Sequence, residues 1–179
     1  SGVRMLDALS GHRRADLLPP DGFHATSVAV SGAQVAVAWA ATDHRRAGLI
    51  GFYEAHTLRE LALIQAGFHP DMVTFSPDGN YLLAANEGEP TDDYRFDPEG
   101  SITLVDLRAG LPHAVVRELD FHLLDPQRSA LRQRGVRLVG PSRVHPDGQA
   151  TVSEDLEPEC IVVEPNSQRA WVTLQENNA

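Results

Sequence analysis

The segments GFHATSVAV (residues 22–30) and GFHPDMVTF (residues 67–75) share their first three residues and begin 45 positions apart. A third segment, PECIVV (158–163), follows the pattern of residues 70–75 at a spacing of 88. Each segment is followed by turn residues, which are SGA (31–33), SPDGN (76–80) and EPNSQ (164–168). Pro, Asp, Gly and Ser favour tight turns. A turn motif that recurs with its strand indicates a protein built from repeated units.

Short apolar stretches continue each unit. The expected second strands are 34–40, 81–85 and 170–174, the third strands 48–53 and 101–107, and the fourth strands 60–64 and 113–119. Four short strands in about 45 residues are typical of a propeller blade. The sequence therefore predicts an all-β protein, a β-propeller of four-stranded antiparallel blades. Helical periodicity is limited to residues 126–134. An ordinary antiparallel sandwich is the alternative, and the shared Gly-Phe-His start argues against it.

The repeat divides the chain into five parts. They are the end of a preceding blade (1–20, with its strands within 3–18), a blade (21–66), a blade with an acidic loop at 86–100 (67–120), an insertion between blades (121–152), and the truncated start of a further blade (153–179). A propeller needs at least about four blades to close. We therefore expect this chain to be an N-terminal fragment of about three blades.

Composition narrows the possible functions. The formal net charge is −10, and the sequence has no cluster of basic residues with interleaved aromatics, so nucleic-acid binding is disfavoured. The longest apolar run, 35–41, is far shorter than the ~20 residues of a membrane span. Cys160 is the single cysteine and precludes an internal disulfide. We expect it to be a small buried residue, and we expect Trp39 and Trp171 to pack between blades.

The loop at 86–100 is the first candidate site. Calcium binds six to eight oxygens from carboxylates, amides and backbone carbonyls, and this loop offers all three. Its spacing does not match an EF-hand. The alternative is a solvated loop held by Arg95 and backbone amides. The candidate metal ligands in the loop are Asn86, Glu87, Glu89, Asp92, Asp93, Asp97 and Glu99.

Further acids flank the third repeat. They are Asp155, Glu157 and Glu159 before its first strand and Glu176 after its second strand. Adjacent blades bring equivalent strand ends together, so we expect Glu87, Glu157, Glu159 and Glu176 to converge at one mouth of the central channel. The alternative is that these carboxylates accept hydrogen bonds from backbone amides at blade junctions.

Motifs for catalysis are absent from the sequence. It has no nucleophile elbow, phosphate-binding loop or dinucleotide-binding glycine pattern, and no His or Cys spacing typical of zinc. His24 and His69 occupy the same repeat position, which indicates a shared packing or turn role. No catalytic residue is predicted.

Several segments together resemble the choice-of-anchor I domain family: PDMVTFSPDG (70–79), ANEGEPTDDY (85–94), DPEGS (97–101), DLEPE (155–159) and LQENNA (174–179). The resemblance covers most of the chain from about residue 22. It implies an exported bacterial propeller of seven blades, often with a C-terminal surface anchor, that is secreted, periplasmic or at the cell surface. Such proteins are often labelled alkaline-phosphatase-like or mesenchyme-specific cell-surface-glycoprotein-like. Cys160 departs from the family, which usually has an aromatic residue there.

We expect a binding or structural module whose acidic loops hold calcium or another divalent cation. A metal-dependent phosphoesterase is the alternative, with Glu87, Asp92, Asp93 and Glu157 holding the cations. The expected partners are the missing blades or another copy of the chain, joined through open blade edges.

Overall fold

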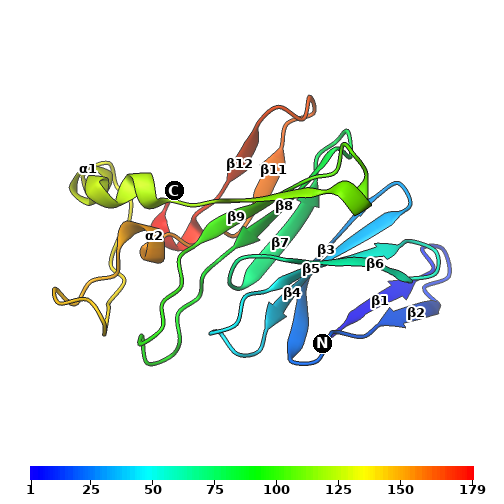
Figure 1. The fold of residues 1–179 in the computed structure, drawn as a ribbon, viewed down its shortest axis with the longest axis horizontal. Coiled ribbons are helices and arrows are strands. Elements are labelled where there is room, and N and C mark those ends of the chain that lie inside the picture. Colours follow the sequence, from blue (N-terminus) through cyan, green and yellow to red (C-terminus); the bar gives the residue numbers. More distant parts are fainter.

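The computed structural model describes residues 1–179 as an all-β protein of antiparallel sheets with few helices (Figure 1). A first hairpin joins β1 (Val3–Leu6) and β2 (Arg13–Leu17). A four-stranded sheet follows, with β3 (Phe23–Ser31), β4 (Gln34–Ala41), β5 (Leu49–Glu54) and β6 (Glu60–Gln65). A second contains β7 (Pro70–Phe75), β8 (Tyr81–Asn86), β9 (Ser101–Asp106) and β10 (Val115–Leu119). The last hairpin joins β11 (Ile161–Val163) and β12 (Ala170–Val172).

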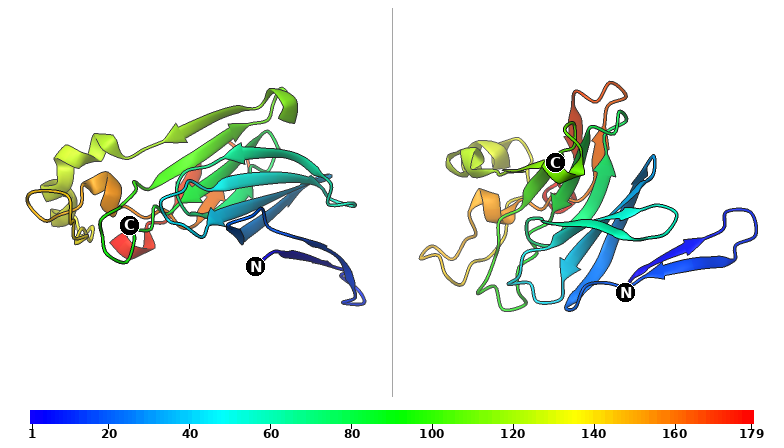
Figure 2. Two further views of the ribbon diagram at one scale, coloured as in Figure 1. Left: turned by 60° about the horizontal axis from the view of Figure 1, so that its bottom comes forward. Right: turned by 45° about the vertical axis from the view of Figure 1, so that its right-hand side comes forward.

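Both four-stranded sheets have the same topology, in which each strand pairs with its neighbour in the sequence. Figure 2 shows the first hairpin, the two sheets and the last hairpin following one another side by side in chain order. Residues 23–65 and 70–119 therefore form separate, similar sheets. The predicted antiparallel four-stranded units are present.

The predicted turns connect the first two strands of each sheet. Ser31 pairs with Gln34, which leaves a two-residue loop, and Gly32 in that loop has a positive φ of 55° as tight hairpins require. In the second sheet, the Ser76 hydroxyl donates to the Asp78 carboxylate at 2.6 Å and accepts from the Tyr81 N–H at 2.9 Å. The side-chain hydrogen bond from Ser76 is the largest cause that lowers the pKa of Asp78 to about 2.

Strand β4 is buried on both faces because a neighbouring sheet covers each one. Its alternate residues Val37 and Trp39 pack toward the first hairpin, in a cluster that includes Val3 and Leu17. The opposite face of the sheet joins the largest core cluster, which spans both four-stranded sheets and contains Ala36, Ala38, Ile50, Phe52, Ala66, Val73, Leu82, Ala84, Val105 and Leu107. Burying a large apolar side chain of this kind contributes ~1.5–3 kcal/mol.

Two hydrogen bonds between the first strands of the sheets add to this core. The Thr26 hydroxyl donates to the Pro70 carbonyl at 2.6 Å, and the Val73 N–H donates to the Ser27 hydroxyl at 3.2 Å. On the far side of the second sheet, Ile161 of β11 packs with Leu83 and other residues of β8 and β9. Each four-stranded sheet therefore packs between two neighbours, which are the other four-stranded sheet and one of the terminal hairpins.

Residues 120–160 leave the stack at one end (Figure 1). They contain a 3₁₀ helix (His122–Gln127), α1 (Arg128–Gln133) and α2 (Val152–Asp155), packed around Leu138 and Leu156. Helix α1 agrees with the helical periodicity at 126–134. None of the helices combines the length and apolar character needed to cross a membrane.

Two expectations about single residues were wrong. Cys160 is exposed rather than buried, because side chains alternate along a strand and Ile161 takes the inward position. Trp171 is 64% exposed, whereas Trp39 is fully buried as expected, with its Nε1–H donating to the Tyr53 hydroxyl at 3.0 Å.

Candidate functional site

The first part of the site lies where β7 begins and β8 ends. These strands are antiparallel, and Pro70 pairs with Asn86 at this end of the ladder. Backbone pairing continues beyond it, because the Glu87 N–H donates to the His69 carbonyl at 2.9 Å. Nδ1 of His69 lies 2.8 Å from Oε2 of Glu89 and 3.6 Å from Oε2 of Glu87. One ligand-capable atom from each of the three residues lies within 4.8 Å of the others.

The loop between β8 and β9 is folded back against α2. Gly88 has a φ of 71°, and a Cβ atom there would lie 2.7 Å from the Pro98 carbonyl oxygen, so the position requires glycine. Gly100 contacts the Leu156 carbonyl closely, and its N–H donates to the Ser153 carbonyl at 3.1 Å. The second half of the acidic loop is therefore fixed beside the acids that precede β11.

Those acids are positioned by a capped helix and by a buried amide. The Glu154 N–H donates to the Thr151 hydroxyl at 3.2 Å, and the Thr151 N–H donates to the Glu154 carboxylate, which completes a capping box on α2. Oδ1 of Asn177 accepts the Glu157 N–H at 3.1 Å, and Nδ2 donates to the Asp155 carbonyl at 2.6 Å. These bonds bring the segment before β11 and the residues after β12 together.

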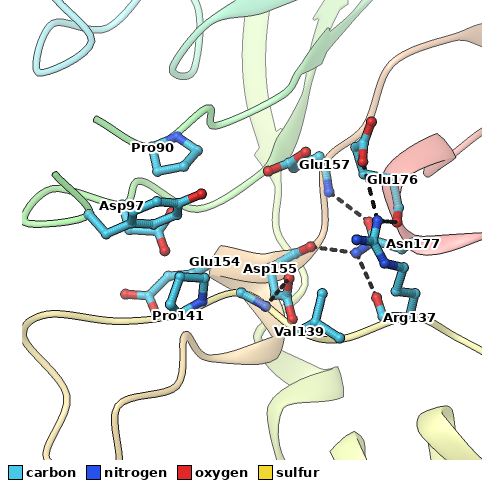
Figure 3. Close-up of a pocket in the computed structure, with 12 residues that line it drawn as sticks. Pro90, Asp97, Arg137, Val139, Pro141, Glu154, Asp155, Glu157, Glu176 and Asn177 are labelled. Carbon is cyan, nitrogen blue, oxygen red and sulfur yellow. Dashed lines mark hydrogen bonds and ion pairs between the residues drawn. The ribbon is translucent and has the colours of Figure 1, made fainter. Parts of the chain in front are cut away.

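A cavity of about 160 Å³ opens between these segments (Figure 3). Its lining is largely polar, and Figure 3 shows carboxylates distributed around it. The single cationic group in the lining is Arg137, whose Nη1 lies 3.4 Å from Oε2 of Glu176. The acids that line it are Asp97, Glu154, Asp155, Glu157 and Glu176. Oδ1 of Asp97 and Oδ2 of Asp155 are buried without a hydrogen-bond partner.

Burial and mutual repulsion disfavour ionisation of these carboxyls. Desolvation, followed by the charge of Asp71, raises the pKa of Glu87 to about 8. Desolvation also raises the pKa of Asp97 to about 7, with Glu154 the next cause, and that of Glu157 to about 7, with Glu176 the next cause. Burial likewise raises the pKa of Asp155 and of Glu159. The site concentrates negative charge that the protein only partly neutralises.

Comparison with known proteins identifies the family. The sequence matches the choice-of-anchor I domain over residues 6–179. The chain belongs to the choice-of-anchor I domain family. Membership implies an exported or cell-surface protein.

Among solved structures, hydrazine synthase from Kuenenia stuttgartiensis resembles this choice-of-anchor I domain with a TM-score of 0.64 and 10% sequence identity. The match covers 97% of this chain, which spans 43% of the length of that one. At this identity the likeness concerns the fold alone. No curated protein matches the sequence.

The choice-of-anchor I domain brings most of the predicted ligands into one region. The acids Glu87, Glu157, Glu159 and Glu176, expected to approach one another, are linked electrostatically, since Glu157 and Glu159 act on Glu87 and Glu176 acts on Glu157. The predicted residues that lie here are Glu87, Glu89, Asp97, Asp155, Glu157, Glu159 and Glu176. Metal binding by them stays a prediction.

Four other predicted ligands have different surroundings. Asn86 is fully buried and donates to Ser101 and Thr103. Glu99 is exposed, with Oε2 at 2.5 Å from Nε2 of His122. Asp92 and Asp93 line a separate polar hollow with residues 42–45. The Thr91 hydroxyl, 2.8 Å from Oδ1 of Asp93, is the main cause that lowers the pKa of Asp93.

Sequence reasoning missed several members of the site. His69 was expected to have a packing or turn role, and Asp71 was not named as a ligand. Glu154 belongs to the predicted acidic segment 154–159 but is not among the predicted ligands. The repeat could have indicated His69 as a site residue. His69 directly precedes the first strand of its unit, and the predicted ligand Glu157 lies just before the first strand of the third unit.

Asn177 lies in the candidate segment 175–178 that follows the second strand of the third repeat, but its linking role depends on contacts 20 or more residues away. Arg137 gave no local signal, since its carbonyl meets Asn177 40 residues further along the chain.

Proposed function

We propose that this chain is part of an exported propeller, seven-bladed when intact, that acts as a binding or structural module. In this proposal the acidic loops hold a divalent cation, calcium in the first instance, beside the mouth of the central channel. The chain-order succession of similar sheets supports the propeller, and family membership supports export. Blade number and cation are parts of the proposal.

The observation that best supports a bound cation is the group of carboxylates around Asp97 and Glu157, whose negative charges are only partly neutralised by the protein. Two carboxylate oxygens there are buried without a partner. The raised pKa values of Asp97 and Glu157, both about 7, express the same lack of positive charge. A bound cation would neutralise these groups, and a set of donors made only of oxygen suits calcium.

Thermal melting with added calcium or with a chelator tests the proposal. Calcium at 100 times its Kd adds ~2.7 kcal/mol to the stability of a protein that binds it only when folded. For a chain of this size, this raises the melting midpoint by about 5–11 °C. An unchanged midpoint rejects the cation.

A double variant localises the effect. Asp97→Asn with Glu157→Gln removes two charges from the cavity with little change of shape, and we expect it to lose the calcium response. Asp92→Asn with Asp93→Asn is the matched control, because these residues line the separate hollow and should leave the response intact. A calcium response that survives in the first variant assigns the ion to another place.

No structural observation favours hydrolysis. The four acids of the phosphoesterase alternative are divided, because Asp92 and Asp93 line one hollow and Glu157 another. Assay of the protein on a generic phosphomonoester with added metal separates the two functions. Turnover that disappears in Glu157→Gln would support the enzyme against the binding module.

The partner in this proposal is a further sheet, from missing blades or from another copy. The outer side of the last hairpin carries Val162 and Trp171, which are 66% and 64% exposed. Strand β10 is exposed along its whole length. Light scattering over a range of protein concentrations tests self-association, and a mass that stays at one chain leaves the missing blades as the partner.

A further inference from the structure

We infer that a second metal site, for a borderline transition metal of the zinc class, is formed by His69, Glu87 and Glu89, with His44 as the fourth ligand. This site is separate from the calcium cavity around Asp97 and Glu157, whose lining contains none of these four residues. It concerns different donor types, and it uses imidazoles that have no role in the carboxylate cavity. The linear sequence lacks a zinc motif because the ligands come from separate segments of the repeat.

The repeat itself places the ligands. His24 and His69 lie 45 residues apart, and so do His44 and Glu89. His44 belongs to the loop between β4 and β5, and Glu89 to the equivalent loop between β8 and β9. The ring centroids of His44 and His69 are 5.7 Å apart, and those of His24 and His69 are 6.3 Å apart. Equivalent positions of adjacent sheets thus converge on one point.

The distances suit one small ion. Zinc binds imidazole nitrogen and carboxylate oxygen at about 2.0–2.2 Å, so two ligand atoms of a tetrahedral site lie ~3.3 Å apart. Nδ1 of His69 is 2.8 Å from Oε2 of Glu89 and 3.6 Å from Oε2 of Glu87. Nδ1 of His44 is 3.7 Å from Oε2 of Glu89. The ligand atoms of His69, Glu87 and Glu89 lie within 4.8 Å of one another, and His44 approaches this group through Glu89.

An unpaired nitrogen points to a missing ligand. The Nδ1 atom of His44 is buried and has no hydrogen-bond partner, in a side chain that is 35% exposed overall. An unsatisfied buried nitrogen costs free energy, which coordination to a metal would remove. The backbone bond from the Glu87 N–H to the His69 carbonyl holds two of the ligands in place, and the side chains of His69 and Glu87 are only 22% and 21% exposed.

Donor chemistry selects the metal. Imidazole nitrogen suits zinc, copper, iron and nickel, whereas calcium prefers oxygen. Two carboxylates supply the two negative charges that balance a divalent ion. The additional carboxylates that act on Glu87, those of Asp71, Glu157 and Glu159, favour a cation over an anionic ligand at this place.

Titration calorimetry with zinc chloride tests the site in the metal-free protein. We expect one equivalent to bind, and we expect His69→Gln and Glu87→Gln each to weaken zinc binding about tenfold or more, since loss of even an outer-shell partner of a metal ligand commonly costs this much. His44→Gln should also weaken zinc binding, and unchanged affinity in this variant would overturn the assignment of His44 as the fourth ligand. His122→Gln is the matched control, because His122 also pairs with a glutamate but lies elsewhere, and its zinc affinity should equal that of the parent.

Zinc binding that is equally tight in His69→Gln and Glu87→Gln overturns the inference and shows adventitious binding to other histidines. Circular dichroism and melting of each metal-free variant confirm that it folds. If a variant fails to fold, the cobalt(II) absorption spectrum of the parent decides: intense bands of tetrahedral nitrogen and oxygen coordination support the site, and their absence rejects it. The Asp97→Asn, Glu157→Gln protein should retain zinc binding, so the calcium and zinc proposals fail separately.

Discussion

Asn177 lies 20 residues beyond Glu157 in the sequence, yet its side-chain oxygen accepts the Glu157 backbone N–H at 3.1 Å. Its amide nitrogen donates to the carbonyls of Asp155 and Arg137, at 2.6 and 3.0 Å. One buried side chain therefore joins the end of the chain to two segments that line the acidic cavity. The position of Glu157 depends on this residue.

We predict that Asn177→Ala destabilises the protein by about 2–4 kcal/mol, because it removes three hydrogen bonds and leaves buried backbone groups without partners. Urea unfolding measures this change. The calcium response should weaken as well, because Glu157 and the cavity lose their support.

Two variants make this prediction specific. Asn177→Asp keeps an acceptor for the Glu157 N–H but loses both donors, so its stability should fall between those of the parent and Asn177→Ala. Gln175→Ala, at an exposed position in the same 3₁₀ helix, should change stability by less than ~0.5 kcal/mol. Equal stability of Asn177→Ala and Gln175→Ala would contradict the role of Asn177.

Gly51 faces the buried pair of Trp39 and Tyr53. A Cβ atom at this glycine would lie 2.6 Å from Nε1 of Trp39 and 2.5 Å from the Tyr53 hydroxyl oxygen. We predict that Gly51→Ala destabilises the protein by about 1–3 kcal/mol through overpacking. Thermal melting should show a midpoint lower by ~2–4 °C per kcal/mol.

The reason for this loss is checked by the double variant Gly51→Ala, Tyr53→Phe. Removal of the hydroxyl takes away the closest of three contacts of the new methyl group, while Nε1 of Trp39 and Cε2 of Tyr53 remain at 2.6 Å. The cost of Gly51→Ala should therefore be smaller in the Tyr53→Phe background than in the parent. An equal cost in both backgrounds places the strain elsewhere.

Much of the fold was predictable from local patterns. The strands 34–40 and 60–64 were placed within one residue of their observed ends, because turn residues and alternating apolar side chains are local properties. The start of β10 was placed two residues early, since residues 111–113 form a 3₁₀ helix instead. The number of blades in the intact protein is not a local property of the sequence, so it remains part of the proposed function.

The site was predictable only in part. Repeat alignment predicts that Glu87 and Glu157 approach one another, because equivalent strand ends meet in stacked sheets, and the charge of Glu157 does contribute to the raised pKa of Glu87. Asp92 and Asp93 share the same acidic loop but turn to another hollow, since the Thr91 hydroxyl and the Arg95 N–H bind Asp93 locally. Composition does not show which way each side chain in such a loop points.

The reactivity of Cys160 tests which side chains before and along β11 face the solvent. The structure exposes it, contrary to the expectation from its apolar surroundings. We predict that Ellman's reagent modifies one thiol in the native protein as completely as in the protein unfolded by guanidinium. A thiol that reacts only after unfolding would show that another sheet or a second copy covers this strand.

The acidic site also predicts an unusual dependence of stability on pH in the presence of chelator. The folded-state pKa values of Glu87, Asp97 and Glu157 are raised to about 8, 7 and 7. Unfolded carboxyls titrate near ~4. Between these values the folded protein binds more protons than the unfolded chain, so its stability falls as the pH rises from about 4 to about 8.

Below this window the direction reverses, because the lowered pKa values of Asp78 and Asp106, both about 2, make their stabilisation disappear as the pH falls from ~4 to ~2. The metal-free protein should therefore melt at its highest temperature near pH 4–5. A loss of ~2 kcal/mol by pH 8 lowers the midpoint by about 4–8 °C. Melting of the Asp97→Asn, Glu157→Gln protein is the control, and its midpoint should change less between pH 5 and pH 8, since two of the five carboxyls with a raised pKa no longer titrate. A parent protein whose midpoint rises steadily from pH 5 to pH 8 would show that these carboxylates are already compensated within the chain, and the reason for a cation at this site would be lost.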